Sequence, residues 1–582
     1  MNRCLLLCIC LFSASVASQA EEFTYASIGS VVEDFTLDNS YGKSVSLSDF
    51  KDEEVIVIAF LGTECPLAKL YGPRLSQLQT RFGEDAVILG VNSNTQDSMT
   101  ELSAFVQRYD INFPMLKDVG NRVADALGAE RTPEVFVLDQ QRIVRYHGRI
   151  DDQYGVGYSR ERDLKSDLAV AVEELLAGKP VSNPETEAVG CYIGRVSKTA
   201  EKGNITYTKH IAPILNARCV SCHRDQELAP FTLTSYDDVL GWEDTILEVI
   251  DDNRMPPWFA NPAHGEFSND ARLSEEEKVL IATWVENGMP EGDPKDLPEP
   301  PKFATGWKIP KPDQVIVMNQ EVKDGEKVGK PFTVPAEGVV DYKRFVVDPE
   351  WDEDKYIYAA EARPQNRSVV HHILVYVIPP GARDIDLRQV LVGYAPGGLP
   401  IHLKDGTALK VAAGSKLLFE MHYTPNGYEQ TDLSYTGVCF MDESKVERLI
   451  KGQIAINPRF KIQPGESDHE VFAMYQSRRD QLLLSMTPHM HLRGKAFRYT
   501  ARFPDGSTDV LLDIPNYDFN WQLKYILKEP RLLPRGTVIE CRAVYDNSEQ
   551  NLSNPDPTRV VRWGDQSFDE MMIGFMDTVP AT

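Results

Sequence analysis

The sequence is short of cysteine, of positive charge and of long apolar runs, and each shortage excludes a class of protein. Nine cysteines in 582 residues are too few for a disulfide-stapled scaffold of this size. The chain has 61 Lys and Arg residues against 87 Asp and Glu, and its net charge of −26 repels nucleic acid and anionic membranes. Beyond the N-terminus, no apolar run reaches the roughly 20 residues that a membrane span requires. We therefore expect no nucleic-acid partner and no membrane span.

The first twenty residues have the pattern of a secretory signal peptide. Arg3 precedes an apolar stretch from Cys4 to Val16, and small residues follow at Ser18 and Ala20. A membrane anchor is the competing interpretation, but the apolar stretch is too short for one. We expect a secreted or periplasmic protein that keeps Cys65, Cys191, Cys219, Cys222, Cys439 and Cys541. In an oxidising compartment, each of these cysteines is expected to be paired, ligated or redox-active.

The rest of the sequence divides into blocks with different secondary-structure patterns. Apolar runs such as Glu54–Phe60 alternate with amphipathic stretches such as Tyr71–Phe82, which predicts an α/β sheet. Helical stretches such as Asp237–Asp251 follow without strands, and then a proline-rich linker leads into β-rich runs such as Lys416–Tyr423. The predicted blocks are an α/β domain at 21–195, an all-α domain at 203–293, a linker at 294–313, and two β-sandwich subdomains at 314–445 and 446–582.

A haem-attachment motif lies in the all-α block. The segment Cys219–His223 reads C-x-x-C-H, in which both thiols form thioether links to haem c and His223 supplies an axial nitrogen. The competing interpretation is a structural disulfide or a partial zinc site. A zinc site needs a second pair of ligands, and His264 is the only later histidine in the block.

The sixth haem ligand is expected to be a methionine, which raises the reduction potential relative to histidine. Met255 follows a predicted helix at a proline-rich turn, and Met289 is the alternative. The block resembles class I cytochrome c domains, including a closing helix over Leu273–Met289. The resemblance implies an electron-transfer haem.

The α/β block contains a candidate redox cysteine. Cys65 follows a buried strand and precedes a predicted helix, whose unpaired N–H groups stabilise a thiolate. Thr132-Pro133 lies just before another predicted strand. The block resembles the redoxin, or AhpC/TSA, branch of the thioredoxin superfamily, which implies a thioredoxin-like fold in which Cys65 faces a cis-proline turn at Thr132-Pro133.

This block also departs from the common patterns of that superfamily. Ala68 occupies the position of the second cysteine of C-x-x-C, and Thr63 is two rather than three residues before Cys65, unlike the peroxiredoxin pattern. Cys191 is a candidate distant resolving thiol that would form a disulfide with Cys65. A thiol-redox role, a degenerate domain used for docking, and a structural Cys65–Cys191 bridge remain as alternatives.

Histidines gather in three contexts of the β-rich block. These are His371-His372, His422, and the pair His489 and His491 in H-x-H spacing. Residues two apart share one face of a strand, so the H-x-H pair can hold one metal directly. Adjacent histidines point to opposite faces, so His371 and His372 need a local irregularity to converge. Neutral imidazole is a suitable ligand for copper. Taken singly, each histidine would be interpreted as a buried core residue, and only the joint pattern favours a metal site.

The order of these motifs, followed by Asp569-Glu570-Met571, resembles the type II copper, ascorbate-dependent monooxygenases. That family includes the peptidylglycine α-hydroxylating and dopamine β-monooxygenases. The resemblance implies two jelly-roll subdomains, two copper ions, and the partners O2, ascorbate or another electron donor, and an organic substrate. It assigns one copper to His371, His372 and His422, and the other to His489, His491 and Met571, with Met572 as the rival thioether.

Two positions depart from the peptide-amidating members of that family. Thr487 stands where those relatives have an arginine for the substrate carboxylate, and Phe575 stands where they have a tyrosine. A glycine-extended peptide is therefore not the expected substrate. The dense disulfides of the family are missing, and pairing of Cys439 with Cys541 stays open.

The leading hypothesis is an exported copper monooxygenase fused to modules that supply electrons, because a tethered haem raises the effective concentration of reductant. The competing hypothesis is a periplasmic haem and thiol electron-transfer protein whose β domain binds copper without oxygenating a substrate. Both predict haem and copper. Only the first predicts O2 consumption coupled to a hydroxylated product.

Overall fold

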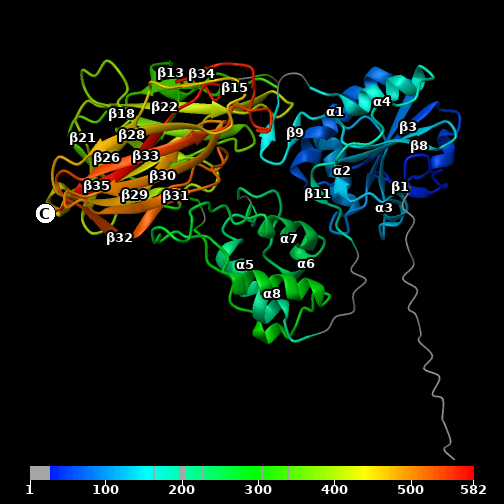
Figure 1. Ribbon diagram of the computed structural model, residues 1–582, viewed down its shortest axis with the longest axis horizontal. Helices are drawn as coiled ribbons and strands as arrows, with labels where there is room; N and C mark the ends of the chain where they lie inside the picture. The colour runs from blue at the N-terminus through cyan, green and yellow to red at the C-terminus, as the bar shows by residue number, and fades with distance from the viewer. Residues whose placement is uncertain are drawn as a thin grey trace, which may run out of the picture.

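The computed structural model describes residues 27–160, 164–195, 203–225, 227–304, 306–336, 338 and 340–581. The expected signal peptide at 1–20 lies outside them. Figure 1 shows an α/β domain, a small helical region and a large all-β region, with the helical region beside both others. Among the described residues, no helix combines the length and apolarity needed to cross a membrane.

The N-terminal domain has a thioredoxin-like α/β fold. Its seven-stranded sheet has the order β2-β1-β5-β4-β3-β7-β8. The central strand β3 (Val55–Phe60) pairs parallel with β4 (Ala86–Asn92) and antiparallel with β7 (Glu134–Asp139). Side chains of β3 alternate between two cores, as period-2 geometry requires. α1 (Pro66–Phe82) packs on one face and α3 (Arg122–Leu127) on the other.

The remaining elements of this domain are short. They are β1 (Thr36–Asn39), β2 (Ser44–Ser46), η1 (Leu47–Phe50), α2 (Met99–Arg108), β5 (Met115–Lys117), β6 (Arg131–Thr132), β8 (Val144–Gly148), β9 (Tyr154–Gly155), β10 (Tyr158–Ser159), α4 (Asp167–Leu176) and β11 (Cys191–Tyr192). The β9–β10 hairpin projects toward the β region in Figure 1.

The helical region packs around two buried tryptophans, Trp242 and Trp284. Its elements are η2 (Tyr207–Ile211), α5 (Ala212–Arg218), α6 (Tyr236–Val239), α7 (Glu243–Asp251), α8 (Glu275–Glu286) and η3 (Pro294–Asp296). The single helix expected over Asp237–Asp251 is wrong, because the chain breaks at Gly241 with φ +84°. A Cβ there would lie 2.3 Å from the Gln96 side chain of the α/β domain, so the break also permits close domain contact.

The β region consists of two pairs of sheets, and each pair shares a core. In the first pair, β12-β24-β17-β21-β25 faces β16-β22-β18-β19, and in the second, β26-β35-β29-β32 faces β28-β33-β30-β31. Cys439 and Cys541 lie in different cores and are free thiols, so the structure does not pair them.

The strands of the first pair are β12 (Gln314–Val317), β16 (Lys343–Val347), β17 (Lys355–Arg363), β18 (Val370–Ile378), β19 (Val390–Tyr394), β20 (Ile401–His402), β21 (Thr407–Val411), β22 (Lys416–Tyr423), β24 (Tyr435–Phe440) and β25 (Arg448–Leu449). Those of the second pair are β26 (Lys451–Ile456), β28 (His469–Gln476), β29 (Gln481–His489), β30 (Gly494–Arg502), β31 (Thr508–Ile514), β32 (Tyr525–Leu533), β33 (Val538–Tyr545) and β35 (Ile573–Pro580). Three small ladders of two to four residue pairs edge this region: β13 (Gln320–Lys323) with β14 (Glu326–Gly329), β15 (Phe332–Val334) with β23 (Gln430–Asp432), and β27 (Lys461–Ile462) with β34 (Val561–Arg562).

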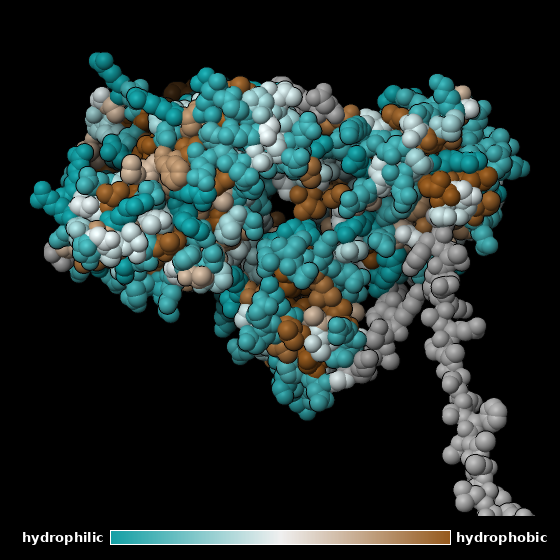
Figure 2. Space-filling view, viewed as in Figure 1, coloured by the Kyte–Doolittle hydropathy of each residue, from teal (hydrophilic) through white to brown (hydrophobic). Residues whose placement is uncertain are grey.

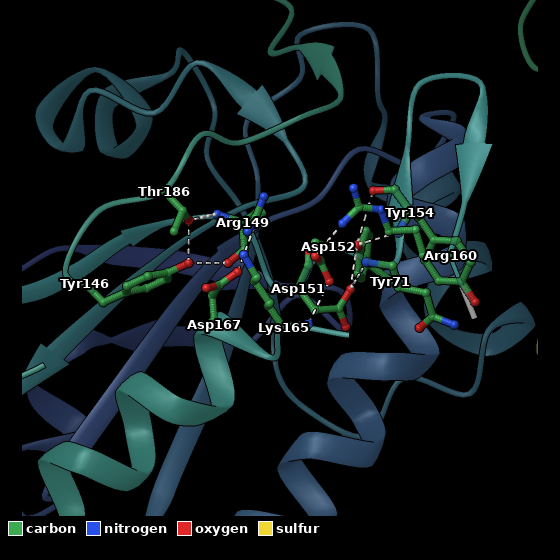
Figure 3. A network of polar contacts seen from close by, with 11 residues as sticks. Tyr71, Tyr146, Arg149, Asp151, Asp152, Tyr154, Arg160, Lys165, Asp167 and Thr186 are labelled. Carbon is green, nitrogen blue, oxygen red and sulfur yellow. Dashed lines mark hydrogen bonds and ion pairs between the residues drawn. The ribbon is translucent and has the colours of Figure 1, made fainter. Parts of the chain in front are cut away.

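A buried polar network fixes the β9–β10 hairpin to α1. Figure 3 shows Tyr71 of α1 pointing toward Asp151 and Tyr154 at the base of the hairpin. The Tyr71 hydroxyl donates to Asp151 Oδ1 at 2.8 Å and accepts from the Tyr154 N–H at 3.1 Å. At the tip, the Gly157 carbonyl accepts from Asn520 Nδ2 of the β region at 2.8 Å. The hairpin therefore joins the helix that begins next to Cys65 to the loop between β31 and β32.

Candidate functional sites

The thiol site brings together two cysteines that are far apart in the sequence. Cys65 is the N-cap residue of α1 and is fully buried. In its protonated form the Sγ donates to the Thr132 carbonyl at 2.9 Å, and the Thr132–Pro133 peptide bond is cis, as the resemblance implies. β11 pairs with β6 so that Cys191 faces Thr132, and the two thiols hydrogen-bond to each other. The predicted pair of Cys65 and Cys191 therefore lies at one site.

The electrostatics of the pair assign different roles to its members. Burial alone would raise the pKa of Cys65, but hydrogen bonds from the thiol and backbone of Cys191 and from the Ala68 backbone lower it to about 6. The pKa of Cys191 is raised well above its ordinary value by the same thiol–thiol contact and by burial. Cys65 is thus the thiolate at neutral pH, and Cys191 holds the proton.

Disulfide exchange at Cys65 should follow the titration of this thiolate. The thiolate is the nucleophile, so we expect the rate with a small aromatic disulfide to be flat above about pH 7 and to fall below about pH 6. Replacing Cys191 with alanine should move the inflection upward, because the thiolate loses a hydrogen-bond donor. The rate is assigned to Cys65 by subtracting the trace of a Cys65→Ser variant. An inflection near 8.5 in the unaltered chain, the value of an ordinary cysteine, would contradict this assignment.

The helical region covers the thiol pair. Cys191 packs against the cores of both the α/β domain and the helical region. The Tyr192 N–H donates to Thr245 Oγ1 of α7 at 3.1 Å, and Arg131 forms an ion pair with Glu248 of α7 at 3.0 Å. Approach to the thiol pair from this side therefore requires the contact with α7 to open.

The C-x-x-C-H segment forms a helical turn directly after α5. The backbone N–H groups of Cys222 and His223 both donate to the Cys219 carbonyl, at 3.0 and 2.9 Å. His223 Nδ1 contacts the Phe231 carbonyl at 3.2 Å, which fixes the ring and leaves Nε2 as the free ligand atom. Burial lowers the pKa of His223, so its ring is neutral, as a ligand must be.

The surroundings of this turn suit a large apolar cofactor. Figure 2 shows apolar side chains gathered on the exposed face of the helical region, over α5 and α8. Half-buried side chains that pack against its core include Phe231, Leu240, Leu247 and Leu280. Met255 lies half-buried after α7, with its N–H bonded to the Val249 carbonyl at 2.9 Å, whereas Met289 is 4% exposed and belongs to the core. The donor set and the apolar face both fit haem c.

The first histidine cluster forms a compact three-nitrogen site. His371, His372 and His422 each offer a ring nitrogen, and these atoms lie within 4.8 Å of one another. His372 pairs with His422 across β18 and β22, and the register shifts between Val370 and His372. This β-bulge at His371 is the irregularity that adjacent histidines require to converge on one point.

The imidazoles of this cluster are in the form that binds a metal. Burial lowers the pKa of His371 to about 4 and holds the pKa values of His372 and His422 well below the ordinary value, with the neighbouring imidazoles adding to the effect. All three rings are neutral at pH 7, and a neutral imidazole nitrogen is a ligand for copper.

The second histidine set forms around the end of β29. The rings of His489 and His491 lie 5.2 Å apart, centroid to centroid, at 87°. β29 ends at His489, so His491 lies beyond the strand. The two histidines therefore do not lie on one strand face, which was the predicted arrangement. His491 Nδ1 contacts the Asp569 carbonyl at 3.3 Å, while its buried Nε2 has no hydrogen-bond partner among the described residues. Met571 lines a cavity with both histidines, whereas Met572 is fully buried in the core.

Phe519 lies between the two histidine sets. Its ring centroid is 5.4 Å from that of His371, in a stacked arrangement, and 5.8 Å from that of His491. His372 lines the same cavity as the second set. The first candidate metal site therefore reaches the cavity through His372, and the Phe519 ring contacts a histidine of each site.

Several residues of these sites were not found from the sequence. The side-chain oxygen Oε1 of Gln522 accepts a hydrogen bond from His489 Nδ1 at 2.8 Å. Buried Glu570 accepts from the backbone N–H of His491 at 2.8 Å, and burial raises its pKa to about 8. The position of Glu570 next to Met571 was the available signal, but Gln522 and Phe519 belong to no motif.

Comparison with known proteins supports the assignment of the N-terminal domain. The AhpC/TSA family matches residues 28–147. The thiol-disulfide oxidoreductase ResA of Halalkalibacterium halodurans is 30% identical over 124 residues, which are 21% of this chain and 69% of that protein. The chloroplastic peroxiredoxin Q of Suaeda salsa is 29% identical over 142 residues, covering 23% of this chain and 62% of that protein. A hypothetical protein, SMc02350, from Sinorhizobium meliloti 1021 has a crystal structure that is 31% identical, with a TM-score of 0.28, and covers 29% of this chain and 96% of its own.

Proposed function

Through residues 28–147 the chain belongs to the AhpC/TSA family, and we propose that this redox domain serves a copper-dependent monooxygenase formed by the β region. The observation that carries the proposal is that a compact cluster of three histidines contributes His372 to a cavity that is also lined by His489, His491 and Met571. The paired sheets agree with the jelly-roll subdomains that the resemblance implies. The enzyme is exported, and its organic substrate is hydroxylated with O2.

The reaction sets the demands on the protein. One substrate C–H bond, O2, two electrons and two protons give an alcohol and water. Copper, for which imidazole and thioether are suitable ligands, would be held by the two ligand sets and would supply the one-electron chemistry. The chain keeps the ligand imidazoles neutral by burial, orients His489 through Gln522, and orients His491 through the Asp569 carbonyl.

The haem c domain is proposed as the electron supply. Cys219 and Cys222 would carry the thioether links, His223 one axial nitrogen, and Met255 the other axial position. Ascorbate is the alternative donor, as in the family that the β region resembles. Tethering on one chain keeps the donor domain at high effective concentration, and the thiol pair borders the helical region through α7.

The axial ligand can be tested by changing each methionine without changing its volume. Met255→Leu is expected to lower the haem reduction potential and alter its spectrum, because a thioether ligand raises the potential. Met289→Leu should leave both unchanged, since leucine fills the same core space. Potentiometric titration of both variants checks this, and the reverse pattern would identify Met289 as the ligand.

The proposed reaction is tested by isotope incorporation. Copper-loaded full-length protein is supplied with ascorbate, ¹⁸O2 and a panel of organic substrates, and the products are analysed by mass spectrometry. The proposal expects one ¹⁸O atom in the organic product and its loss when copper is removed. Reversible reduction of haem and copper with no labelled product from any substrate would favour the non-oxygenating electron-transfer protein instead.

A further inference from the structure

One cavity of about 260 Å³ lies between the two pairs of sheets, and its lining limits what it can bind. Side chains from both pairs contribute, including His372 from the first and His489, His491 and Met571 from the second. Most of the remaining lining is aliphatic, as in Leu374, Ile385, Val392, Leu409 and Ile573. An apolar wall of this kind favours an apolar ligand.

Every charged side chain of the lining is already paired. Arg344 contacts both Glu420, at 2.6 Å, and Asp565, at 3.0 Å. Lys524 pairs with Asp577 at 2.5 Å. The remaining cation, Arg388, pairs with the Asp386 carboxylate outside the lining at 2.9 Å. An ionised ligand would therefore find no free opposite charge in the cavity, and burying an unpaired charge is energetically costly.

Besides the proposed ligand atom His491 Nε2, two uncharged polar groups in the lining have no partner among the described residues. The Tyr342 hydroxyl is buried and unpaired, and its ring lies 4.8 Å from that of His422 and 5.5 Å from that of His372. The Gln522 Nε2 is also buried and unpaired, because the amide uses its oxygen to bind His489. Both groups are hydrogen-bond donors, and leaving a buried donor unsatisfied costs about 1–3 kcal/mol.

We infer that the cavity binds an uncharged, mainly apolar organic molecule that carries one acceptor oxygen, such as a ketone or an ether, and that Tyr342 donates to that oxygen. This inference rests on the proposed function for its chemical consequence, since it names the substrate class of the same site. Tyr342 acts as a specificity-determining residue. The fit of the molecule between the two pairs of sheets brings its aliphatic part toward His489, His491 and Met571.

The inference is tested by binding alone, with a matched series of small probes. Indane, 1-indanone, indane-1-carboxylate and 1-aminoindane share one ring system and differ in one polar group. Their dissociation constants are measured by ligand-observed NMR on the full chain, with and without copper. We expect 1-indanone to bind about 3–10-fold more tightly than indane, the gain of one net hydrogen bond. The anion and the cation should bind at least about 10-fold more weakly than 1-indanone.

Substitutions then show whether the Tyr342 hydroxyl accounts for the tighter binding of 1-indanone. Tyr342→Phe should weaken the binding of 1-indanone to the level of indane and leave the binding of indane unchanged. A general loss of structure would weaken both. Tyr358→Phe removes a hydroxyl from a strand of the same sheet pair outside the cavity lining and should change neither. Tighter binding of the carboxylate or ammonium probe, or an unchanged 1-indanone preference in Tyr342→Phe, would overturn the inference. Because binding is measured without turnover, these outcomes are independent of whether ¹⁸O enters a product.

Discussion

Replacing His491 with alanine is expected to abolish O2-dependent hydroxylation and to remove one of two bound copper ions. His491 is fully buried, and its Nε2 lacks any hydrogen-bond partner among the described residues, as a nitrogen reserved for a metal would. Loss of a partner that only orients a ligand typically costs 10–100-fold in metal affinity or activity, so loss of the ligand itself should cost at least about 100-fold. Copper analysis and product formation under ascorbate and O2 measure the two effects.

Two companion variants make this result specific. Gln522→Ala keeps both ligand imidazoles but removes the group that orients His489, so a smaller loss of about 10–100-fold is expected. His402→Ala changes an exposed histidine of β20 outside both clusters and should retain both copper ions and full activity. Full oxygenation by the His491→Ala protein would show that the proposed O2-binding copper is misplaced.

Replacing Cys219 with serine is expected to give the other large effect, because one of two thioether links to haem disappears. In the double variant Cys219→Ser, Cys222→Ser, no haem should remain on the chain after denaturation. His223 would still offer a nitrogen, but without a covalent link the cofactor is held only by that bond and by the apolar face. Intact-protein mass spectrometry and the haem absorption of the denatured chain measure the loss.

The double variant also separates the electron supply from the copper sites. Its β region should keep both copper ions, because no copper ligand lies in the helical region. With ascorbate as donor, hydroxylation should persist, whereas electrons delivered through the haem should be lost. Cys439→Ser is the matched control, since this buried cysteine lies in the β region and should not affect haem. Covalent haem retained by the double variant would contradict the assignment of the C-x-x-C-H motif.

Local pattern predicted the regular elements well. The strand expected over Lys416–Tyr423 has those bounds as β22, because its apolar run and flanking turns define it. The helix expected from Tyr71 begins earlier, at Pro66, since proline at the first helical position needs no N–H partner. The helix expected across Gly241 breaks there, where close approach of the α/β domain, invisible in the local sequence, fixes the backbone.

The sites were predictable only as far as motifs define them. The need for an irregularity at His371 and His372 follows from strand geometry, but the bulge itself depends on the register of β18 against β22. Tyr342 lines the cavity from one segment, and Gln522 lines it from the loop between β31 and β32, which also carries Phe519; none of the three belongs to a motif. Long-range packing brings them together, so the sequence carries no local signal for their roles.

The measurement that tests the central claim most directly is the iron and copper content of the exported, purified protein, combined with electron paramagnetic resonance of the copper-loaded form. The ligand sets predict about one iron and about two copper ions per chain, with both copper signals of type II character. His422→Ala should reduce the copper content by about one ion, because it removes a nitrogen from the three-histidine site. Iron without retained copper would contradict the account, and would leave a haem and thiol protein whose buried histidines are structural.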